Sequence, residues 1–267
     1  MSENIVLSAG KIARRIAEKG ESGTVVGVFS QGIYCKIRNE MLLIHDAKWG
    51  YVPFGVAIGN FAAFSADVSA NVDDTVVLSE ESLAIGDKVY KVSLECECPT
   101  AFAPSGEPAP ERLDAICEYI KEHGSEAGII ELIKLNRVGC ADTVKALTEG
   151  DITAAVKLIG LGRGLTPSGD DFLCGFLAVL NALGVLAVSL REVIYDNLDR
   201  TNHISAAYIS AVLGRRYFSV YDSAVRAIYS DGDFKGDVDF VLSMGASSGT
   251  DTLCGALAAA RMILNKK

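Results

Sequence analysis

The sequence predicts an α+β protein in which a β-rich N-terminal domain, built as an antiparallel barrel or sandwich, precedes an all-helical domain. Three observations predict this. Short runs rich in β-branched and aromatic residues dominate residues 1–98, four of the six prolines fall within residues 99–110, and helical periodicity takes over in residues 111–267. The prolines predict a linker between the two domains. The absence of β-α-β alternation argues against a doubly wound sheet.

The first domain is expected to open with an amphipathic helix at Leu7–Glu18. Strands are expected where short apolar runs are separated by turn residues, and the Gln31-Gly32 and Asn39-Glu40 pairs predict two hairpins. His45-Asp46 is expected to lie in a turn at the end of a strand. The expected strands are Gly23–Ser30, Ile33–Arg38, Met41–His45, Val52–Ile58, Thr75–Ser79 and Lys88–Glu97.

The second domain is expected to contain short helices followed by longer ones. They are Glu111–Glu122, Ser125–Leu135, Asp142–Leu147, Ile152–Ile159, Asp170–Leu183, Ser189–Leu198, Ile204–Leu213, Val220–Ser230 and Thr250–Leu264. The stretch from Phe172 to Leu190 has no charged residue and is long enough to span a bilayer. Because Asn181 interrupts it and Gly184 can end a helix, we expect a helix buried inside a protein rather than a membrane span.

Charge and cysteine content exclude several functional classes. The 267 residues carry a formal net charge of -9, and no cluster of Lys and Arg offers a surface for nucleic acid. The seven cysteines form no CxxC pair, which is typical of small buried side chains in a reducing compartment. The N-terminus does not look like a secretory signal. We therefore expect a cytoplasmic protein that contacts neither nucleic acid nor membrane.

The most informative feature is an internal repeat. SGDDFLCGFLA at residues 168–178 aligns with SGTDTLCGALA at residues 248–258, with identity at eight of eleven positions. Glycine-rich segments, Gly160–Gly164 and Gly245–Gly249, lead into the two copies. A helix that starts this way directs unpaired N–H groups and a positive dipole end toward an anion. The repeat predicts that the two helix starts face each other and share one small anion, although two capping boxes of the Ser-x-x-Asp type would need no ligand.

The two copies differ at positions that suggest separate roles. Arg163 adds a positive charge to the first glycine-rich segment, and Asp170 has no acidic counterpart because Thr250 stands in the second copy. Asp171 does have a counterpart, Asp251, so we expect capping from Asp171 and substrate orientation or proton transfer from Asp170.

A third helix start, with Thr201 or Asn202 as N-cap and Ser205 one turn inside, could converge on the same place. The candidate catalytic residues are thus Arg163, Asp170 and Asp171. The candidate substrate-binding residues are Gly162, Gly164, Thr166, Ser168, Gly169, Thr201, Ser205, Ser247, Ser248, Gly249, Thr250 and Asp251.

The segment GLGRGLTPSGDDFLCG, residues 160–175, closely resembles the signature of a bacterial family associated with the AllH subunit of oxamate carbamoyltransferase. The Arg200, Thr201, Ile204 and Ser205 positions and the second repeat are similar too. The resemblance implies carbamoyl exchange between oxamate plus carbamoyl phosphate and oxalurate plus phosphate, in allantoin and purine catabolism. It also implies partner subunits, because the activity belongs to an assembly.

The residues are compatible with that chemistry. Two opposed helix starts with Arg163 could bind phosphate and a carboxylate and stabilise a developing oxyanion without a metal or another cofactor. Alternatively, the adjacent carboxylates could hold Mg²⁺, as in a metal-dependent phosphotransferase, although no GxxxxGK[ST] segment is present. A further alternative is a non-catalytic, anion-binding or scaffold subunit. The expected partners are small anionic substrates, other subunits of a carbamoyltransferase complex and, as an open alternative, further copies of the chain.

Overall fold

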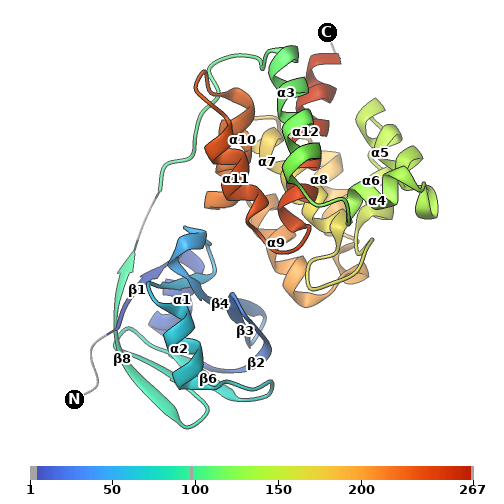
Figure 1. The fold of residues 1–267 in the computed structure, drawn as a ribbon. Helices are drawn as coiled ribbons and strands as arrows, with labels where there is room; N and C mark the ends of the chain where they lie inside the picture. Colours follow the sequence, from blue (N-terminus) through green and yellow to red (C-terminus); the bar gives the residue numbers. More distant parts are fainter. Residues whose placement is uncertain (1–4, 97–98, 266–267) are drawn as a thin grey trace. The chain divides into compact units, whose positions relative to one another are not determined.

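The computed structural model describes residues 5–96 and 99–265, and the chain divides into two compact units (Figure 1). One unit comprises Met1–Thr100 together with Tyr217–Ser219, and the other comprises Ala101–Arg216 together with Val220–Lys267. The first is a β-barrel and the second is helical, which confirms the predicted α+β class.

The strands close into a barrel in the order β1-β5-β4-β3-β2-β6-β7-β8, with β1 paired to β8. Most neighbours are antiparallel, as expected, but β1 runs parallel to β8 and β4 runs parallel to β5. Period-2 patterning identifies a strand but not its direction, which depends on the connections. The strands are β1 Ile5–Ala9, β2 Ser22–Phe29, β3 Gly32–Ile37, β4 Glu40–Asp46, β5 Gly55–Ile58, β6 Thr75–Leu78, β7 Ser82–Ile85 and β8 Lys88–Cys96.

The start of the barrel differs from the expected single helix. Residues Ile5–Ala9 form β1, and helix α1 begins only at Lys11 and ends at Lys19. Leu7 and Ala9 are fully buried in the barrel core. Gly10 lies between the two elements. The position requires glycine, because a methyl group there would lie 2.2 Å from the carbonyl oxygen of Val52.

Two further barrel elements were not predicted. Strand β7 and helix α2, Phe61–Val68, were both missed, although Asn60 caps α2 through the Ala63 N–H at 3.2 Å. Both predicted hairpins are present, with their turns one residue earlier than expected, at residues 30–31 and 38–39. His45 is buried at the end of β4, and Asp46 caps the short helix η1, Ala47–Trp49. The predicted strand end at Glu97, and Cys98, lie outside the described residues.

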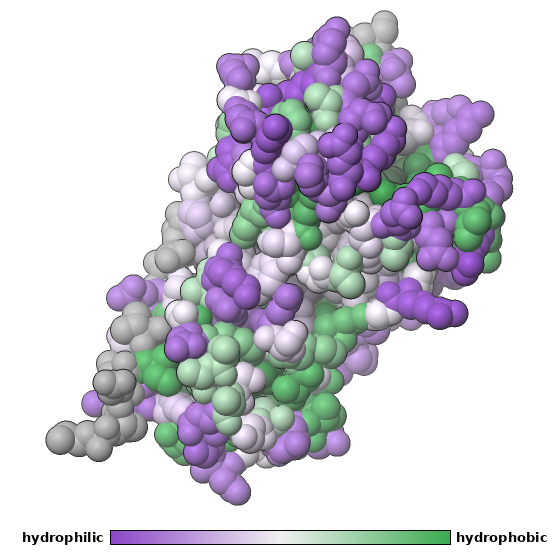
Figure 2. All heavy atoms as spheres, viewed as in Figure 1, coloured by the Kyte–Doolittle hydropathy of each residue, from purple (hydrophilic) through white to green (hydrophobic). Residues whose placement is uncertain are grey.

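Surface hydropathy differs between the two units. Figure 2 shows hydrophobic side chains gathered on the visible face of the barrel, whereas the visible face of the helical unit is largely hydrophilic. On β2, the exposed side chains of Val26, Val28 and Phe29 are apolar. Cys35, Cys117, Cys140, Cys174 and Cys254 are free thiols, and Cys35, Cys140 and Cys174 are buried as expected.

The helical unit is built around α7, Ser168–Ala182, and α12, Ser248–Asn265, which lie against each other. Every residue of α7 from Ser168 to Leu180 is buried, which confirms the expected buried helix. Within the described ranges, no helix is both long and apolar enough to cross a membrane. The other helices are α3 Pro110–His123, α4 Ile129–Lys134, α5 Cys140–Glu149, α6 Ala154–Leu158, α8 Val188–Tyr195, α9 His203–Leu213, α10 Ser219–Tyr229 and α11 Lys235–Leu242, with short turns η2 Arg137–Gly139 and η3 Leu198–Arg200; α11 was not predicted.

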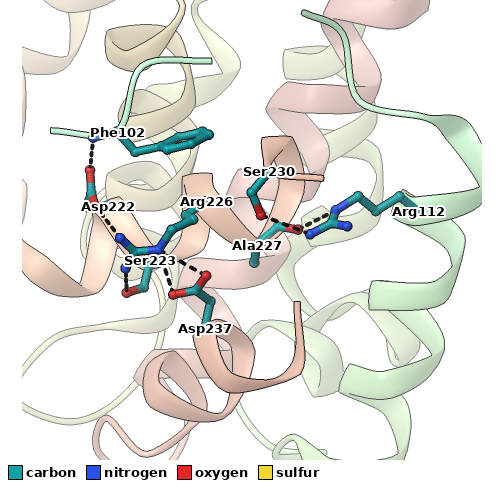
Figure 3. A network of polar contacts seen from close by, with 8 residues as sticks. All are labelled: Phe102, Arg112, Asp222, Ser223, Arg226, Ala227, Ser230 and Asp237. Carbon is teal, nitrogen blue, oxygen red and sulfur yellow. Dashed lines mark hydrogen bonds and ion pairs between the residues drawn. The ribbon is translucent and has the colours of Figure 1, made fainter. Parts of the chain in front are cut away.

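The beginning of the helical unit is fastened to α10 (Figure 3). Residues 99–109 form no helix or strand, and the Phe102 N–H donates to Asp222 Oδ1 at 2.6 Å. On the same helix Arg226 bonds Asp237 at 2.9 Å and lies 3.4 Å from Asp222. Arg112 of α3 donates to the carbonyl oxygen of Ala227 at 2.7 Å, which satisfies part of the C-terminal end of α10.

Candidate functional site

The two repeated segments meet because their helices cross at glycines. A methyl group on Gly175 of α7 would lie 1.9 Å from the carbonyl oxygen of Thr252, and one on Gly255 of α12 would lie 1.9 Å from that of Phe172. The contacts are related by the repeat itself, since 172 and 252, like 175 and 255, are equivalent positions. The two copies therefore pack as a pseudo-symmetric pair with their backbones in contact.

The starts of the two helices are joined by hydroxyl and carboxylate groups. Thr166 Oγ1 lies 3.0 Å from Ser248 Oγ and donates to Asp171 Oδ2 at 2.9 Å. The Ser248 hydroxyl also bonds Asp171, and the Ser168 hydroxyl bonds Asp251. The predicted convergence of the two loop-helix segments is thus confirmed, since each serine binds the aspartate of the other copy.

This exchange overturns the capping-box interpretation of the first repeat. Ser168 is the first residue inside α7, and Pro167 before it offers no side-chain cap. In the second copy, Asp251 Oδ1 accepts the Ile129 N–H at 2.7 Å, at the start of α4. The Ser-x-x-Asp pattern predicts a contact between the serine and the aspartate of one helix start. In the structure, each aspartate takes its partner from another segment of the chain.

The two equivalent aspartates are buried acids. Burial raises the pKa of Asp171 well above its usual range, with the Ser248 hydroxyl acting in the opposite direction and the charge of Asp251 adding to the rise. Burial also raises the pKa of Asp251 to about 6, against hydrogen bonds from Ile129 and the Ser168 and Ser247 hydroxyls. Asp251 has no exposed surface, and its Oδ2 has no well-aligned partner in the described part of the chain. Both groups hold protons more tightly than ordinary carboxyls.

Asp170 has a structural role that the sequence did not suggest. Its side chain is 1% exposed, and its Oδ1 accepts the Gly160 N–H at 2.8 Å. Its Oδ2 accepts the hydroxyls of Thr201 at 2.5 Å and Ser205 at 2.6 Å. The absence of an acidic counterpart at Thr250 did not suggest these contacts. Thr250 has a duty of the same kind, since its Oγ1 accepts the Ser125 N–H at 2.9 Å.

The glycine-rich loop before α7 needs its glycines for backbone reasons. Gly160, Gly162 and Gly164 have φ of 72°, 121° and 103°, in the region that L-residues with side chains rarely adopt. Gly162 also lies close above the start of α7, where a methyl group would be 2.7 Å from Ser168 N. Arg163 is exposed and makes no hydrogen bond or ion pair with the described residues. The loop thus presents one free cation beside the joined helix starts.

Other predicted binding residues serve the packing of the main chain. The Gly169 N–H donates to the carbonyl oxygen of Leu161 at 2.8 Å, and the Gly249 N–H donates to that of Met244 at 3.0 Å. These two amides are therefore already engaged, whereas Arg163 is exposed and Thr166, Ser247 and Ser248 are partly exposed. Asn202 is the N-cap of α9, as one of the two predicted alternatives.

Sequence reasoning missed two sets of contacts at the site. Asn202 Nδ2 donates to the carbonyl oxygen of Leu165 at 2.9 Å, and the Ser125 and Ile129 amides bind the second repeat. No local pattern signals either set, because the partners are 37 or more residues apart. Among the residues with described positions, no three His, Cys, Asp or Glu side chains gather to hold a metal ion. The two oxygens of Asp170 accept from three donors of the chain itself, which are Gly160, Thr201 and Ser205.

Comparison with known families bears on this region. The model of a family described as oxamate carbamoyltransferase subunit AllH matches residues 158–260. This region is AllH-like. The match runs from the end of α6 into α12, covers less than half of the chain and includes both repeats, so it confirms the resemblance of the 160–175 motif. The printed description of that family names a subunit of oxamate carbamoyltransferase. No solved structure matches the chain significantly.

Proposed function

We propose that the chain is a subunit of oxamate carbamoyltransferase and that the joined starts of α7 and α12 bind the phosphate of carbamoyl phosphate. One observation carries the proposal: the two repeats meet at Thr166 and Ser248, directly beside the loop that presents the unpaired Arg163. In a chain of net charge -9, a free arginine at a glycine-rich loop is a local site for an anion. The family match over the same residues supports the same reaction class.

The reaction constrains what each group would do. The amide nitrogen of oxamate attacks the carbamoyl carbon, the bond from that carbon to the phosphate oxygen breaks, and the nitrogen loses a proton. Arg163 would pair with the phosphate as it gains charge. Asp171 in its ionised form is the candidate proton acceptor through the Thr166 hydroxyl, because the two groups lie 2.9 Å apart and a carboxylate whose pKa is raised by burial is a stronger base than an ordinary one. Oxalurate and phosphate are the products.

The experiment measures phosphate release from carbamoyl phosphate and oxamate, with the purified chain alone and with its partner subunits. Arg163→Ala should weaken phosphate binding in calorimetry by about 10- to 100-fold, the value of a lost hydrogen bond to a charged group. Arg261→Ala is the matched control, because Arg261 lies near the other end of α12, about 20 Å along the helix axis, in a surface pair with Asp114. Equal affinities for the wild type and both variants would contradict the proposal.

A second candidate is a subunit that binds the anion without performing the chemistry. The burial of the three acidic residues favours it, since Asp170, Asp171 and Asp251 are only 1%, 7% and 0% exposed. The same experiment separates the two candidates. If Arg163→Ala weakens phosphate binding to this chain while turnover of the assembled enzyme at saturating substrate is unchanged, the reacting groups belong to a partner subunit.

A further inference from the structure

The carboxylate of Asp170 lies at the junction of three segments that are distant in the sequence. It belongs to the first turn of α7, accepts from Gly160 at the start of the glycine-rich loop, and accepts from Thr201 and Ser205 at the start of α9. Three donors and 1% exposure leave the group no surface on which a substrate could lie. The Asp170 carboxylate therefore has a structural role, which is to hold the three segments together.

The loop is fastened at both ends to the segment that starts α9. At its first end, Gly160 is held by Asp170 and packs so closely that a methyl group would lie 2.4 Å from the carbonyl oxygen of Arg200. At its other end, the carbonyl oxygen of Leu165 accepts from Asn202 Nδ2 at 2.9 Å. Between these two points Arg163 and Gly164 are exposed and make no hydrogen bond among the described residues. A short loop held at both ends has little conformational freedom. The contacts of Gly160 and Leu165 therefore fix the backbone position of Arg163.

The second repeat offers an internal comparison. Thr250 occupies the position equivalent to Asp170, is 2% exposed, and holds the Ser125 N–H of a different neighbouring segment. In both copies this position ties the helix start to a chain segment that approaches it, although one residue is an acid and the other is not. A duty that is shared by an acid and a hydroxyl is one of hydrogen bonding, not of proton transfer.

We propose that Asp170 is a positioning residue, which holds the loop of residues 160–165 against the start of α9 and thereby presents Arg163 to the phosphate-bearing substrate. The proposal rests on the proposed function for the identity of that substrate. The fixed loop would lower the entropy cost of binding, because Arg163 would not have to be ordered by the anion.

Two substitutions of Asp170 separate support from acid-base chemistry. Asn keeps an oxygen for Gly160, and its amide can donate to the hydroxyls of Thr201 and Ser205, whereas Ala keeps none of these contacts. In the assembled enzyme, Asp170→Ala should raise the KM for carbamoyl phosphate by about tenfold or more. The reason is that the hydrogen bonds that the charged Asp170 accepts are lost, and the loop no longer holds Arg163 in place. Asp170→Asn should stay within about threefold of the wild type in kcat, whereas loss of a general base would cost 100-fold or more.

Hydrogen exchange of the loop provides a readout that is independent of activity. The amides of residues 160–165 should exchange about tenfold faster in Asp170→Ala than in the wild type or in Asp170→Asn. If Asp170→Ala does not fold, Thr201→Val takes its place, since it removes one donor and keeps the side-chain shape. Thr143→Val is the control, because Thr143 is also buried and donates to the carbonyl oxygen of Gly139, away from the loop. It should lower stability without changing exchange of the loop or the KM.

Two results would overturn the proposal. One is a 100-fold loss of kcat in Asp170→Asn with unchanged exchange, which would make Asp170 a general base. The other is loop exchange in Asp170→Ala or Thr201→Val no faster than in Thr143→Val. If the wild type neither binds phosphate nor supports turnover, the proposed function fails, and the exchange data still decide whether Asp170 holds the loop.

Discussion

The crossing of α7 and α12 allows a quantitative prediction for Gly175→Ala. A methyl group at this position would lie 1.9 Å from the carbonyl oxygen of Thr252, while ordinary contact begins near 3.4 Å, so the helices would have to separate by about 1.5 Å. Both contacting atoms belong to helical backbone, which cannot turn aside as a flexible side chain can. Overpacking of this kind costs typically 1–3 kcal/mol, and the better helix propensity of alanine returns about 1 kcal/mol.

Because backbone meets backbone, we expect a cost at or above the upper end of that range and a net loss of about 2 kcal/mol or more. For a domain of this size this corresponds to a fall in melting temperature of roughly 4–8 °C, measured by circular dichroism of the helical signal. Gly236→Ala is the matched control, since Gly236 lies in α11 with no atom within 4 Å of the added methyl group. It should stabilise the protein slightly. Melting of Gly175→Ala within roughly 1 °C of the wild type, or above it, would refute the close crossing.

Two other predictions concern buried polar groups. Burial raises the pKa of Asp251 to about 6, so the folded chain keeps a proton that the unfolded chain releases near pH 4. The contribution of this group to stability is therefore full below about pH 4 and is lost as the pH rises to about 6. Asp251→Asn, which keeps an oxygen for Ile129, should flatten this fall and be more stable than the wild type at pH 7.5 by on the order of 1–3 kcal/mol in urea unfolding; parallel pH profiles for the two proteins would contradict it. Arg112→Ala should lower the free energy of unfolding by about 1–3 kcal/mol, because the carbonyl oxygen of Ala227 (Figure 3) and that of Gly232 lose their donor. Arg112→Lys should recover only part of this loss, since an ammonium group cannot reproduce the guanidinium fork, and full recovery would refute the geometric argument.

Local patterns predicted most of the elements and failed where tertiary contacts decide. The hairpins of β2, β3 and β4 have alternating apolar residues and short polar turns, so the sequence defines them to within one or two residues. The first strand was read as part of a helix, because Leu7 to Ala17 is compatible with helical spacing until Gly10 is known to touch the backbone at Val52. Strand β7 was missed although β6 is equally short, because three of the four residues of β6 are β-branched but only Ile85 is in β7.

The candidate site was predictable as a place but not as a set of contacts. The repeat and its glycines predicted that two helix starts meet, and the crossing at Gly175 and Gly255 produces that meeting. The same residues misled the assignment of roles. A Ser-x-x-Asp pattern beside a helix start predicts a capping box when only one copy is considered. Once the second copy packs against the first, the serine of the other copy lies within reach of each aspartate. Asp171 then bonds Ser248, and Asp251 bonds Ser168, in place of the serine of its own helix.

This exchange has a physical cause in the packing of the repeat. Only glycine at positions 175 and 255 lets the two helix backbones touch, and backbone contact at the crossing brings the first turns close enough for Thr166 to bond Ser248. The hydroxyls then bond buried carboxylates, which would otherwise bear the full cost of desolvation. The acids and the glycines of the repeat therefore depend on one another. Changing Gly175 or Gly255 to alanine should therefore disturb the contacts of Asp171 and Asp251 as well as the helix packing. This is expected although each glycine lies about one helical turn beyond the aspartate of its own helix.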